Sequence, residues 1–398
     1  MDEFEKDMET EEIQELELPE VVEEPEDKTP KNKPPKRKKR KLKRFVKYGL
    51  IFILICVVII VYQLIGCNKL SVSDIYKFES GAIGEICEYD GKILILGYDG
   101  AKTIDLDGQE DENIEYHMAN PHMDVCENMI LLYDKDDKKL AVYEGKEKLY
   151  SYTCDHNIKS AKVNKNGEVV LVTDENGYNY KVSVIVNEGN SRGKEVYYWK
   201  IGDEYLVDVD ISPDGKKIVA ATIKTETGHI EQNVVMIDVD KARELGRSTV
   251  KDALPLCVEF NDKSSAVVIS DDRICGYDTK ASVKWQDNFG NRLLDGYAID
   301  EEGNSVVVLR GIKNNSAIRA YTSGGKNSGE YTTATRVNTV DLNNKYVAVS
   351  EYNKISLVDY SGKVVSELEI KKEVLDVSVI SNNKVVILCK DCIQLLRM

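Results

Sequence analysis

The carboxylates around one Asp-Gly turn are the residues of this sequence best suited to bind a metal ion. Asp105, Asp107 and Asp111 alternate with other residues around Gly108 in the segment DLDGQEDE. Alternating carboxylates beside a glycine can wrap a hard cation such as calcium with oxygen ligands. The same residues are also typical of an Asp-Gly hairpin turn with a solvated acidic loop, which is the interpretation we favour. The sequence therefore offers one calcium candidate, and no cofactor is expected.

Histidine and cysteine pairs give weaker indications of chemistry. His117 and His122 lie close enough in sequence to share a metal, but a zinc site needs a third and a fourth ligand. Cys389 and Cys392 form a C-x-x-C pair at a predicted strand-to-strand turn. That position lacks the helix N-terminus that lowers the pKa of a redox-active thiol. A short hairpin disulfide between them is left open, and a redox site is not expected.

Motifs of catalytic sites are missing from the sequence. It contains no H-E-x-x-H, no G-x-S-x-G, no P-loop and no G-x-G-x-x-G after a predicted strand. We therefore expect the protein not to be an enzyme.

The elements that would position these side chains are short strands in a repeat. From residue 70 onward, runs of Val, Ile, Leu and Tyr alternate with polar residues and are broken by tight turns. A turn residue after an apolar strand recurs with a mean period of about 42 residues, a spacing typical of β-propeller blades with four strands each. The recurring turn positions are Gly91, Asn128, Gly167, Gly215, Lys263, Gly303, Asn344 and Asn383.

A second marker keeps step with the first. Third-strand positions end in an apolar residue and an aspartate, as in Ile104-Asp105, Ile237-Asp238, Tyr277-Asp278 and Val358-Asp359. Eight turn positions predict eight blades. A ring of seven blades is the alternative if Asn128 or Lys263 belongs to an insertion.

Residues 70–78 have no unit of their own and are predicted to be the fourth strand of the last blade, which closes the ring and removes its exposed edges. The fold class predicted is all-β.

Three blocks of different charge precede the repeat. Residues 1–29 hold 14 acidic and 2 basic side chains, residues 30–47 hold 11 basic side chains and no acid, and residues 48–66 hold no charge. An uncharged apolar stretch of this length matches the hydrocarbon thickness of a bilayer when helical. We expect a disordered cytoplasmic tail over 1–47, a transmembrane helix over 48–66 and a propeller over 67–398.

The charge asymmetry around residues 48–66 predicts the orientation. Basic residues precede this segment and are scarce after it, so the N-terminus is expected in the cytoplasm and residues 67–398 outside it, as in a single-pass protein of the cell membrane. An alternative is lipidation at Cys67, since LIGC resembles a lipobox. Anionic lipid headgroups are expected to contact the basic run, which includes Lys36, Arg37, Lys38, Lys39 and Arg40.

Two features carry a resemblance to known families. The segment Ser212–Lys216 (SPDGK), followed by an apolar strand, resembles the repeats of bacterial surface propellers of the YVTN and WD-like superfamily. The layout of acidic tail, basic run, single span and exported propeller resembles a group of uncharacterised single-pass bacterial membrane proteins with a domain of unknown function. That resemblance implies an exported propeller and defines no functional residues.

The predicted function is binding. A membrane-anchored, extracytoplasmic ring of blades is expected to serve as a protein- or glycan-binding scaffold in the cell envelope. Residues 67–398 carry a net charge of -14, which disfavours nucleic acid and favours cationic proteins or neutral glycans. Two alternatives stay open: a transmembrane sensor that signals through the acidic tail, and a propeller-type glycan hydrolase or lyase.

Overall fold

In the computed structural model, the chain divides into two units, residues 1–66 and 67–398. The structure describes residue 52 and residues 71–79, 83–226, 228–311, 315–381 and 384–397. Within those residues, no helix is both long enough and apolar enough to cross a membrane. The predicted tail lies outside them, as does the predicted transmembrane segment except for Phe52.

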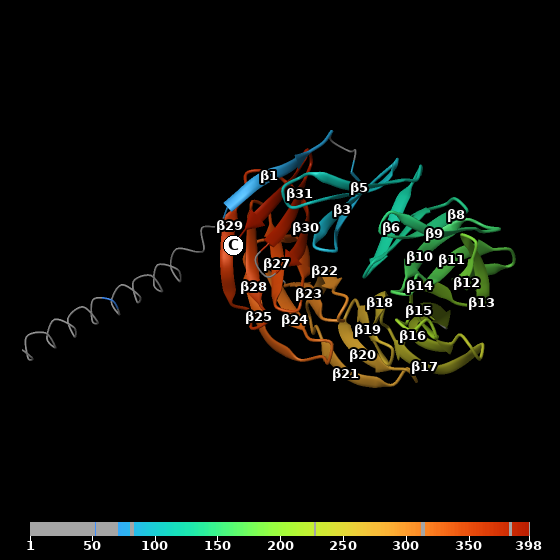
Figure 1. Cartoon of the computed structure of the whole chain (residues 1–398). Coiled ribbons are helices and arrows are strands. Elements are labelled where there is room, and N and C mark those ends of the chain that lie inside the picture. The colour runs from blue at the N-terminus through green and yellow to red at the C-terminus, as the bar shows by residue number, and fades with distance from the viewer. Residues whose placement is uncertain are drawn as a thin grey trace, which may run out of the picture. The chain divides into compact units, whose positions relative to one another are not determined.

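The second unit is built from β-strands that form eight antiparallel blades of four strands each (Figure 1). A single parallel bridge between Arg192 and Ser151 joins the outer strands of blades 2 and 3 into one eight-stranded sheet. Blades 1 and 2 comprise β2 (Glu85–Tyr89), β3 (Lys92–Gly97), β4 (Gly100–Ile104) and β5 (Glu110–Glu115), then β6 (Pro121–Cys126), β7 (Met129–Asp134), β8 (Lys139–Glu144) and β9 (Glu147–Thr153). Blades 3 and 4 comprise β10 (Ile158–Val163), β11 (Val169–Glu175), β12 (Tyr178–Gly189) and β13 (Arg192–Ile201), then β14 (Tyr205–Ile211), β15 (Lys217–Glu226), β16 (His229–Asp238) and β17 (Arg243–Lys251).

The second half of the ring repeats this arrangement. Blades 5 and 6 comprise β18 (Pro255–Asp262), β19 (Ser265–Ser270), β20 (Arg273–Asp278) and β21 (Val283–Asn288), then β22 (Leu293–Ile299), β23 (Ser305–Arg310), β24 (Ser316–Tyr321) and β25 (Asn327–Thr333). Blades 7 and 8 comprise β26 (Val337–Leu342), β27 (Tyr346–Glu351), β28 (Lys354–Asp359) and β29 (Val364–Glu369), then β30 (Val374–Ser381), β31 (Lys384–Cys389), β32 (Cys392–Arg397) and β1 (Ser71–Lys77).

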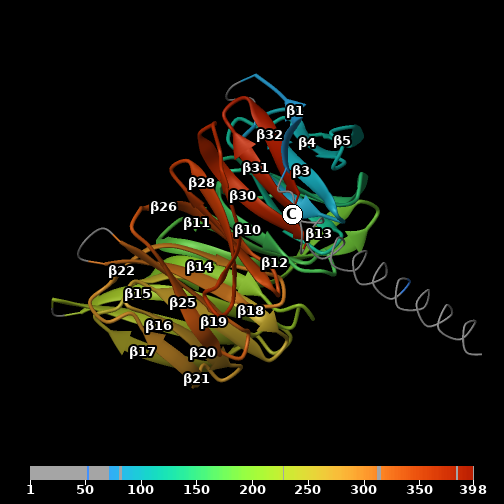
Figure 2. The same cartoon turned by 90° about the vertical axis from the view of Figure 1, so that its left-hand side faces the viewer.

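The ring closes through the first strand of the chain. β1 pairs antiparallel with β32, from Ser71 opposite Arg397 to Lys77 opposite Cys392 (Figure 2). β1 is therefore the fourth strand of blade 8, as the unassigned residues 70–78 predicted. The turn after β4 packs against this strand so closely that a Cβ on Gly108, which has a φ of +84°, would overlap the carbonyl oxygen of Ile75.

Both sequence markers of the repeat are confirmed. Seven of the eight turn positions lie between the first and second strands of a blade, while Asn383 lies outside the described residues. Asn128 and Lys263 each belong to the turn of a separate blade, so the count is eight and not seven. The aspartates of the second marker end the third strands or, for Asp105, directly follow one. Asp105, Asp278 and Asp359 accept hydrogen bonds from N–H groups of the turn that follows.

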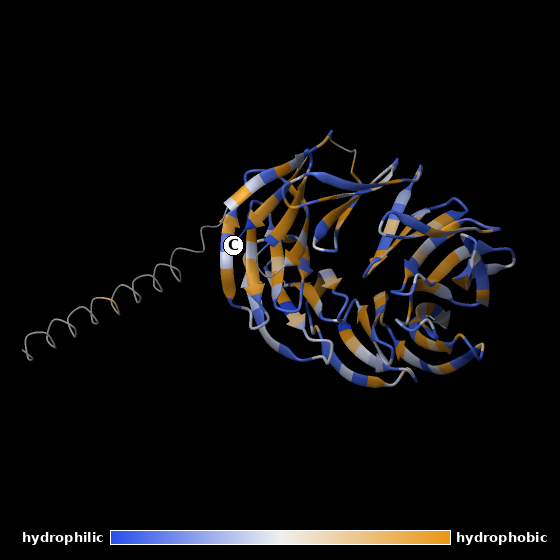
Figure 3. Cartoon of the chain, in the orientation of Figure 1, coloured by the Kyte–Doolittle hydropathy of each residue, from blue (hydrophilic) through white to orange (hydrophobic). Residues whose placement is uncertain are grey.

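The hydrophobic core consists of eight clusters, one between each pair of neighbouring blades. Hydrophobic residues lie mainly on the strands, as the orange segments of Figure 3 show. The cluster between blades 8 and 1 includes Ile86, Ile93, Leu388 and Leu395, so apolar packing closes the ring along with the strand pairing. Trp285 packs in the cluster between blades 5 and 6, and Trp199 packs in the one between blades 3 and 4. Since no blade buries its faces alone, the blades stabilise one another as a ring.

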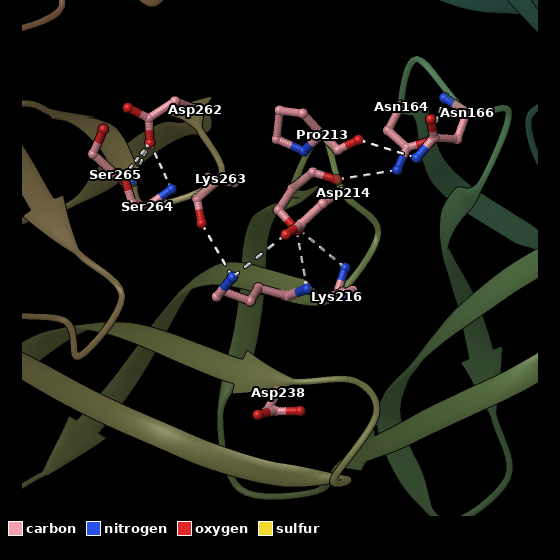
Figure 4. Close-up of polar contacts among 12 residues, drawn as sticks. Asn164, Asn166, Pro213, Asp214, Lys216, Asp238, Asp262, Lys263, Ser264 and Ser265 are labelled. Atoms are coloured by element: carbon pink, nitrogen blue, oxygen red, sulfur yellow. Dashed lines mark hydrogen bonds and ion pairs between the residues drawn. The ribbon is translucent and has the colours of Figure 1, made fainter.

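Neighbouring turns on one side of the ring are joined by hydrogen bonds (Figure 4). We call this side, where first strands end and second strands begin, the turn face. Asn166 Nδ2 donates to the carbonyl oxygen of Pro213 at 3.2 Å, and Lys217 Nζ donates to that of Lys263 at 3.1 Å. Asp214 accepts from Ser212 Oγ at 2.7 Å within its own turn. Blades 3, 4 and 5 are thereby fixed to one another at this face.

Candidate functional site

First strands of neighbouring blades contact one another around the centre of the ring, as β14 does with β18 and β26 with β30. Two register levels are defined by the pairing of each first strand with its second strand. The level near the turn face holds Cys87, Asp124, Lys162, Asp210, Glu259, Ala298, Asp341 and Ser378. The level two residues further on holds Glu85, His122, Ser160, Asp208, Cys257, Gly296, Thr339 and Asp376.

Seven of these positions are acidic, and Lys162 is the one lysine or arginine among them. We call the eight charged residues the central cluster: Glu85, Asp124, Lys162, Asp208, Asp210, Glu259, Asp341 and Asp376.

Several aspartates of the central cluster link adjacent blades. Asp124 accepts a hydrogen bond from the backbone N–H of Val163 at 2.7 Å, Asp210 from that of Phe260 at 2.7 Å, and Asp341 from that of Val379 at 2.7 Å. In each case the donor directly follows the residue that the next blade contributes to the level near the turn face. The first strand is the inner edge of its sheet, so these carboxylates satisfy N–H groups that no further strand reaches.

Lys162 neutralises part of the acidic charge. Its Nζ lies 3.1 Å from Asp208 Oδ2 and 3.8 Å from Glu259 Oε1, and it donates to the carbonyl oxygen of Val258 at 3.1 Å. Burial lowers the pKa of Lys162, but the charges of Asp208, Glu259 and Asp210 outweigh burial and hold this pKa well above its usual range. The ammonium therefore stays charged.

Burial raises the pKa of six carboxyl groups of the central cluster, and in four of them the pKa reaches a value between about 6 and about 8. The pKa of Glu259 rises to about 8, and that of Asp124 to about 7. The pKa of Glu85 rises to about 7, because of burial first and the charge of Asp376 second. The pKa of Asp341 rises to about 6. All four values lie above the ordinary range near 4.

These raised pKa values predict that the fold loses stability as the pH rises. In this range the folded chain binds more protons than the unfolded chain, so the protons that stabilise it are lost as the pH passes through the folded pKa values. Lowering the pH from about 8.5 to about 6.5 is expected to raise the free energy of unfolding by about 1–2 kcal/mol, a figure already reduced for screening by water. Urea titrations of the full chain at both pH values measure the difference.

Glu259→Gln is the variant that checks the cause of this pH effect. It removes the carboxyl group with the highest of the four pKa values, so the dependence between those two pH values should become visibly flatter. An unchanged slope in this variant would show that other groups cause the dependence.

A contact across the diameter of the ring divides the turn-face mouth. Glu301, in the turn after β22, accepts a hydrogen bond from the backbone N–H of Glu127 at 3.1 Å, although the two belong to blades 6 and 2. A cavity of about 210 Å³ lies on one side of this bridge, lined in part by Asp124, Lys162 and Glu259. A cavity of about 430 Å³ lies on the other side, lined in part by Glu88, Asp341 and Glu302. Asp300 and Glu301 line both cavities.

The arrangement suits cation binding better than hydrolysis of a glycan. A glycoside hydrolase needs two carboxyl groups free to act on either side of a sugar. Here Asp208 and Glu259 share the ammonium of Lys162, and Asp208 also accepts from the N–H of Val258 at 2.9 Å. Both groups are already held by protein partners. The two turn-face cavities instead offer the carboxylate of Glu301, which lines both, to a positively charged ligand.

The residues of the calcium candidate each have another partner. Asp105 accepts from the N–H groups of Asp107 and Gln109, both at 2.9 Å. Asp107 lies 3.3 Å from Arg397, and Asp111 forms an ion pair with Lys92 at 2.5 Å. Within the described part of the chain, no group of three or more His, Cys, Asp or Glu side chains is arranged to hold a metal ion.

The remaining sequence candidates are placed apart from the central cluster or used in packing. His117 lies 3.1 Å from Asp99, and the ring of His122 stacks on Tyr133 with centroids 5.5 Å apart. Cys389 and Cys392 are buried free thiols on either side of the β31–β32 turn.

The central cluster was not found from the sequence as a site. In the sequence, Asp208 and Asp210 fit the alternation of a strand of the repeat, and nothing singles out Lys162, Glu259 or Glu301. One signal was present in the sequence: charged residues interrupt the first strand of most repeats, where an apolar residue would be expected.

The fold and the closed ring define the class of protein, a β-propeller. The chain belongs to the family described as a family of unknown function (DUF5711), whose model matches residues 66–398. No curated protein matches the chain in sequence.

Solved structures share this fold at low sequence identity. BamB from Moraxella catarrhalis is 10% identical, with a TM-score of 0.52, and the match covers 82% of this chain and 100% of BamB. The C-terminal WD40 domain of Sif2 is 11% identical, with a TM-score of 0.59, covering 82% and 98%. Chaetomium thermophilum Sqt1, solved bound to the N-terminus of ribosomal protein L10, is 12% identical, with a TM-score of 0.54, covering 82% and 100%. These similarities show the fold.

Proposed function

We propose that the protein is a membrane-anchored, extracytoplasmic scaffold that binds a cationic segment of a cell-envelope protein at its turn face. The observation that carries this proposal is the pair of acid-lined cavities on either side of the Glu127–Glu301 contact. A concave surface lined by carboxylates raises the local concentration of cations and steers them to the site. A closed ring of eight blades holds that surface rigidly.

The anchoring half of the proposal rests on the N-terminal blocks. Residues 48–66 are uncharged and follow 11 basic side chains in residues 30–47, which favours a single span with the N-terminus in the cytoplasm. Lys36, Arg37, Lys38, Lys39 and Arg40 are proposed to contact anionic headgroups. Residues 67–70 then lead into β1, which begins at Ser71 on the turn face.

A solved relative supports the mode of binding. Sqt1, which has the same fold, was solved in complex with the N-terminus of another protein. A propeller can therefore hold a terminal segment of a partner, which is the kind of ligand proposed for this chain.

The test of binding is crosslinking in intact cells followed by purification of the tagged full chain. The wild-type chain is expected to recover envelope proteins whose crosslinked segments are rich in Lys and Arg. Glu301→Lys with Glu302→Lys is expected to lower this recovery at least about tenfold, because it reverses the charge that both cavities present.

Two arms complete the experiment. Glu147→Lys with Glu369→Lys makes the same change of charge on exposed positions of the outer strands β9 and β29 and should leave recovery unchanged. Protease added to intact cells should digest residues 67–398 and spare a tag on the N-terminus. Protection of residues 67–398, or equal recovery by both pairs of variants, would refute the proposal.

A further inference from the structure

The face of the ring opposite the turn face carries exposed apolar side chains on three consecutive blades. They lie at the start of, or along, the first strands β14, β18 and β22, and we call them the apolar crescent: Tyr205, Val207, Leu254, Leu256, Leu293 and Tyr297. Leu293 is 62% exposed and Leu256 is 43% exposed. Tyr297 Oη donates to the carbonyl oxygen of Leu256 at 3.5 Å, so a side chain of blade 6 reaches the backbone of blade 5.

A repeated β-bulge exposes part of this surface. In six blades the first strand has one extra residue at the same register position, namely Lys159, Val207, Leu256, Asp295, Asn338 or Leu375. A bulge redirects the side chain of the extra residue. In blades 4, 5 and 8 that residue is aliphatic and exposed, whereas the other three blades carry a polar residue there. Simple repetition of the blade therefore does not account for the apolar residues of the crescent.

Acidic side chains face the crescent across the centre of the ring. Glu85 and Asp376 belong to blades 1 and 8, which lie opposite blades 5 and 4, and both occupy the register level further from the turn face. Among the described residues, neither carboxylate forms an ion pair with a lysine or arginine, and the charge of Asp376 acts on Glu85. A ligand lying across this face of the ring would meet apolar side chains at one end and, at the other, two carboxyl groups that have no lysine or arginine partner within the described part of the chain.

We propose that this mouth binds a polypeptide segment of another protein that carries large apolar side chains next to lysine or arginine. The apolar side chains lie on the crescent, and the cation lies against Glu85 and Asp376. This inference rests on the proposed binding function and extends it by naming the composition of the segment and a second face that recognises it. Charge complementarity identifies the occupant, because an acidic or uncharged apolar segment would leave the two carboxyl groups without a cationic partner.

Binding of short labelled peptides to the full chain in zwitterionic lipid nanodiscs tests this inference, with empty nanodiscs as the blank. The probe is the hexapeptide Lys-Leu-Lys-Trp-Lys-Leu, followed by fluorescence anisotropy. Replacing its apolar residues by serine, or its lysines by glutamate, is expected to weaken binding at least about tenfold. Equal binding of the glutamate peptide would overturn the assignment of charge.

Variants of the crescent supply the second readout. Leu256→Ser with Leu293→Ser should weaken binding of the lysine-leucine peptide at least about tenfold, and Glu85→Gln with Asp376→Asn should do the same. Tyr352→Ser with Val365→Ser is the matched control, since these side chains are 83% and 47% exposed on blade 7, and should leave binding unchanged. An unchanged affinity in the crescent pair would refute the proposal, provided that a thermal melt shows the variant to be folded.

The two proposals fail separately. If envelope proteins are recovered equally by the wild type and the crescent pair, the further inference is wrong and the binding function stands. If the wild type recovers no envelope protein and yet binds the peptide through the crescent, the proposed function is wrong. A wild-type dimer that becomes monomeric in the crescent pair would show that a second copy occupies this face, and that result would refute the inference.

Discussion

Val72→Asp with Ile75→Asp is expected to lower the free energy of unfolding by about 4–6 kcal/mol, because each change places a carboxylate where an apolar side chain of β1 packs. Val72 packs against the cluster between blades 7 and 8, and Ile75 packs against the cluster between blades 8 and 1. The two changes therefore act on both apolar faces of the closing strand. Urea unfolding followed by tryptophan fluorescence measures the loss.

Ser71→Asp with Ser73→Asp is the control for this prediction. It adds the same charge to exposed positions of the same strand and should change the free energy of unfolding by less than about 1 kcal/mol. Equal losses in the two pairs would mean that added charge, and not packing of β1, destabilises the chain. If the variant with both Val72→Asp and Ile75→Asp were as stable as the wild type, β1 would not close the ring.

Lys162→Met is expected to lower the free energy of unfolding by about 2–4 kcal/mol at pH 8, because it leaves the carboxylates of Asp208 and Glu259 without their common cation. The loss should be smaller at pH 6, where Glu259, with a pKa raised by burial to about 8, is protonated. Adding Glu259→Gln to the variant should restore part of the stability at pH 8. Urea titrations of the full chain at the two pH values measure these differences.

A neighbouring lysine provides the matched control. Lys159 lies on the same strand and forms ion pairs with Asp136 at 2.9 Å and Asp174 at 3.1 Å near the surface. Lys159→Met should cost less than about 1 kcal/mol and show little dependence on pH, since exposed ion pairs contribute little. A loss of the same size at pH 6 and pH 8 in Lys162→Met would contradict the electrostatic explanation.

The repeat could be predicted from the sequence because its signals are local. A turn residue such as Gly215 and a strand-ending aspartate such as Asp278 reflect backbone geometry within a few residues, and both recur once per blade. The closing role of β1 followed from counting strands, since residues 70–78 had no unit of their own and the last unit lacked one strand.

The central cluster could not be predicted in the same way, because its members meet only after the ring has closed. Glu127 and Glu301 are 174 residues apart, and Lys162 contacts Val258 across an intervening blade. No periodicity in the sequence specifies which side chains face each other across the centre of the ring. The bulges that expose Val207 and Leu256 are likewise set by pairing between strands, and the alternation of apolar residues does not reveal them.

Closure by β1 has a mechanical consequence. Tension applied to the chain before Ser71 enters the ring through this strand and is resisted by its pairing with β32, which begins at Ser71 opposite Arg397. A pull along the strand axis loads all the paired residues in shear, while a pull across it peels them apart one after another from that end. The pairing of β1 with β32 within blade 8 is therefore the first contact that such a force loads, and its loss would separate β1 from blade 8 before the other blades part.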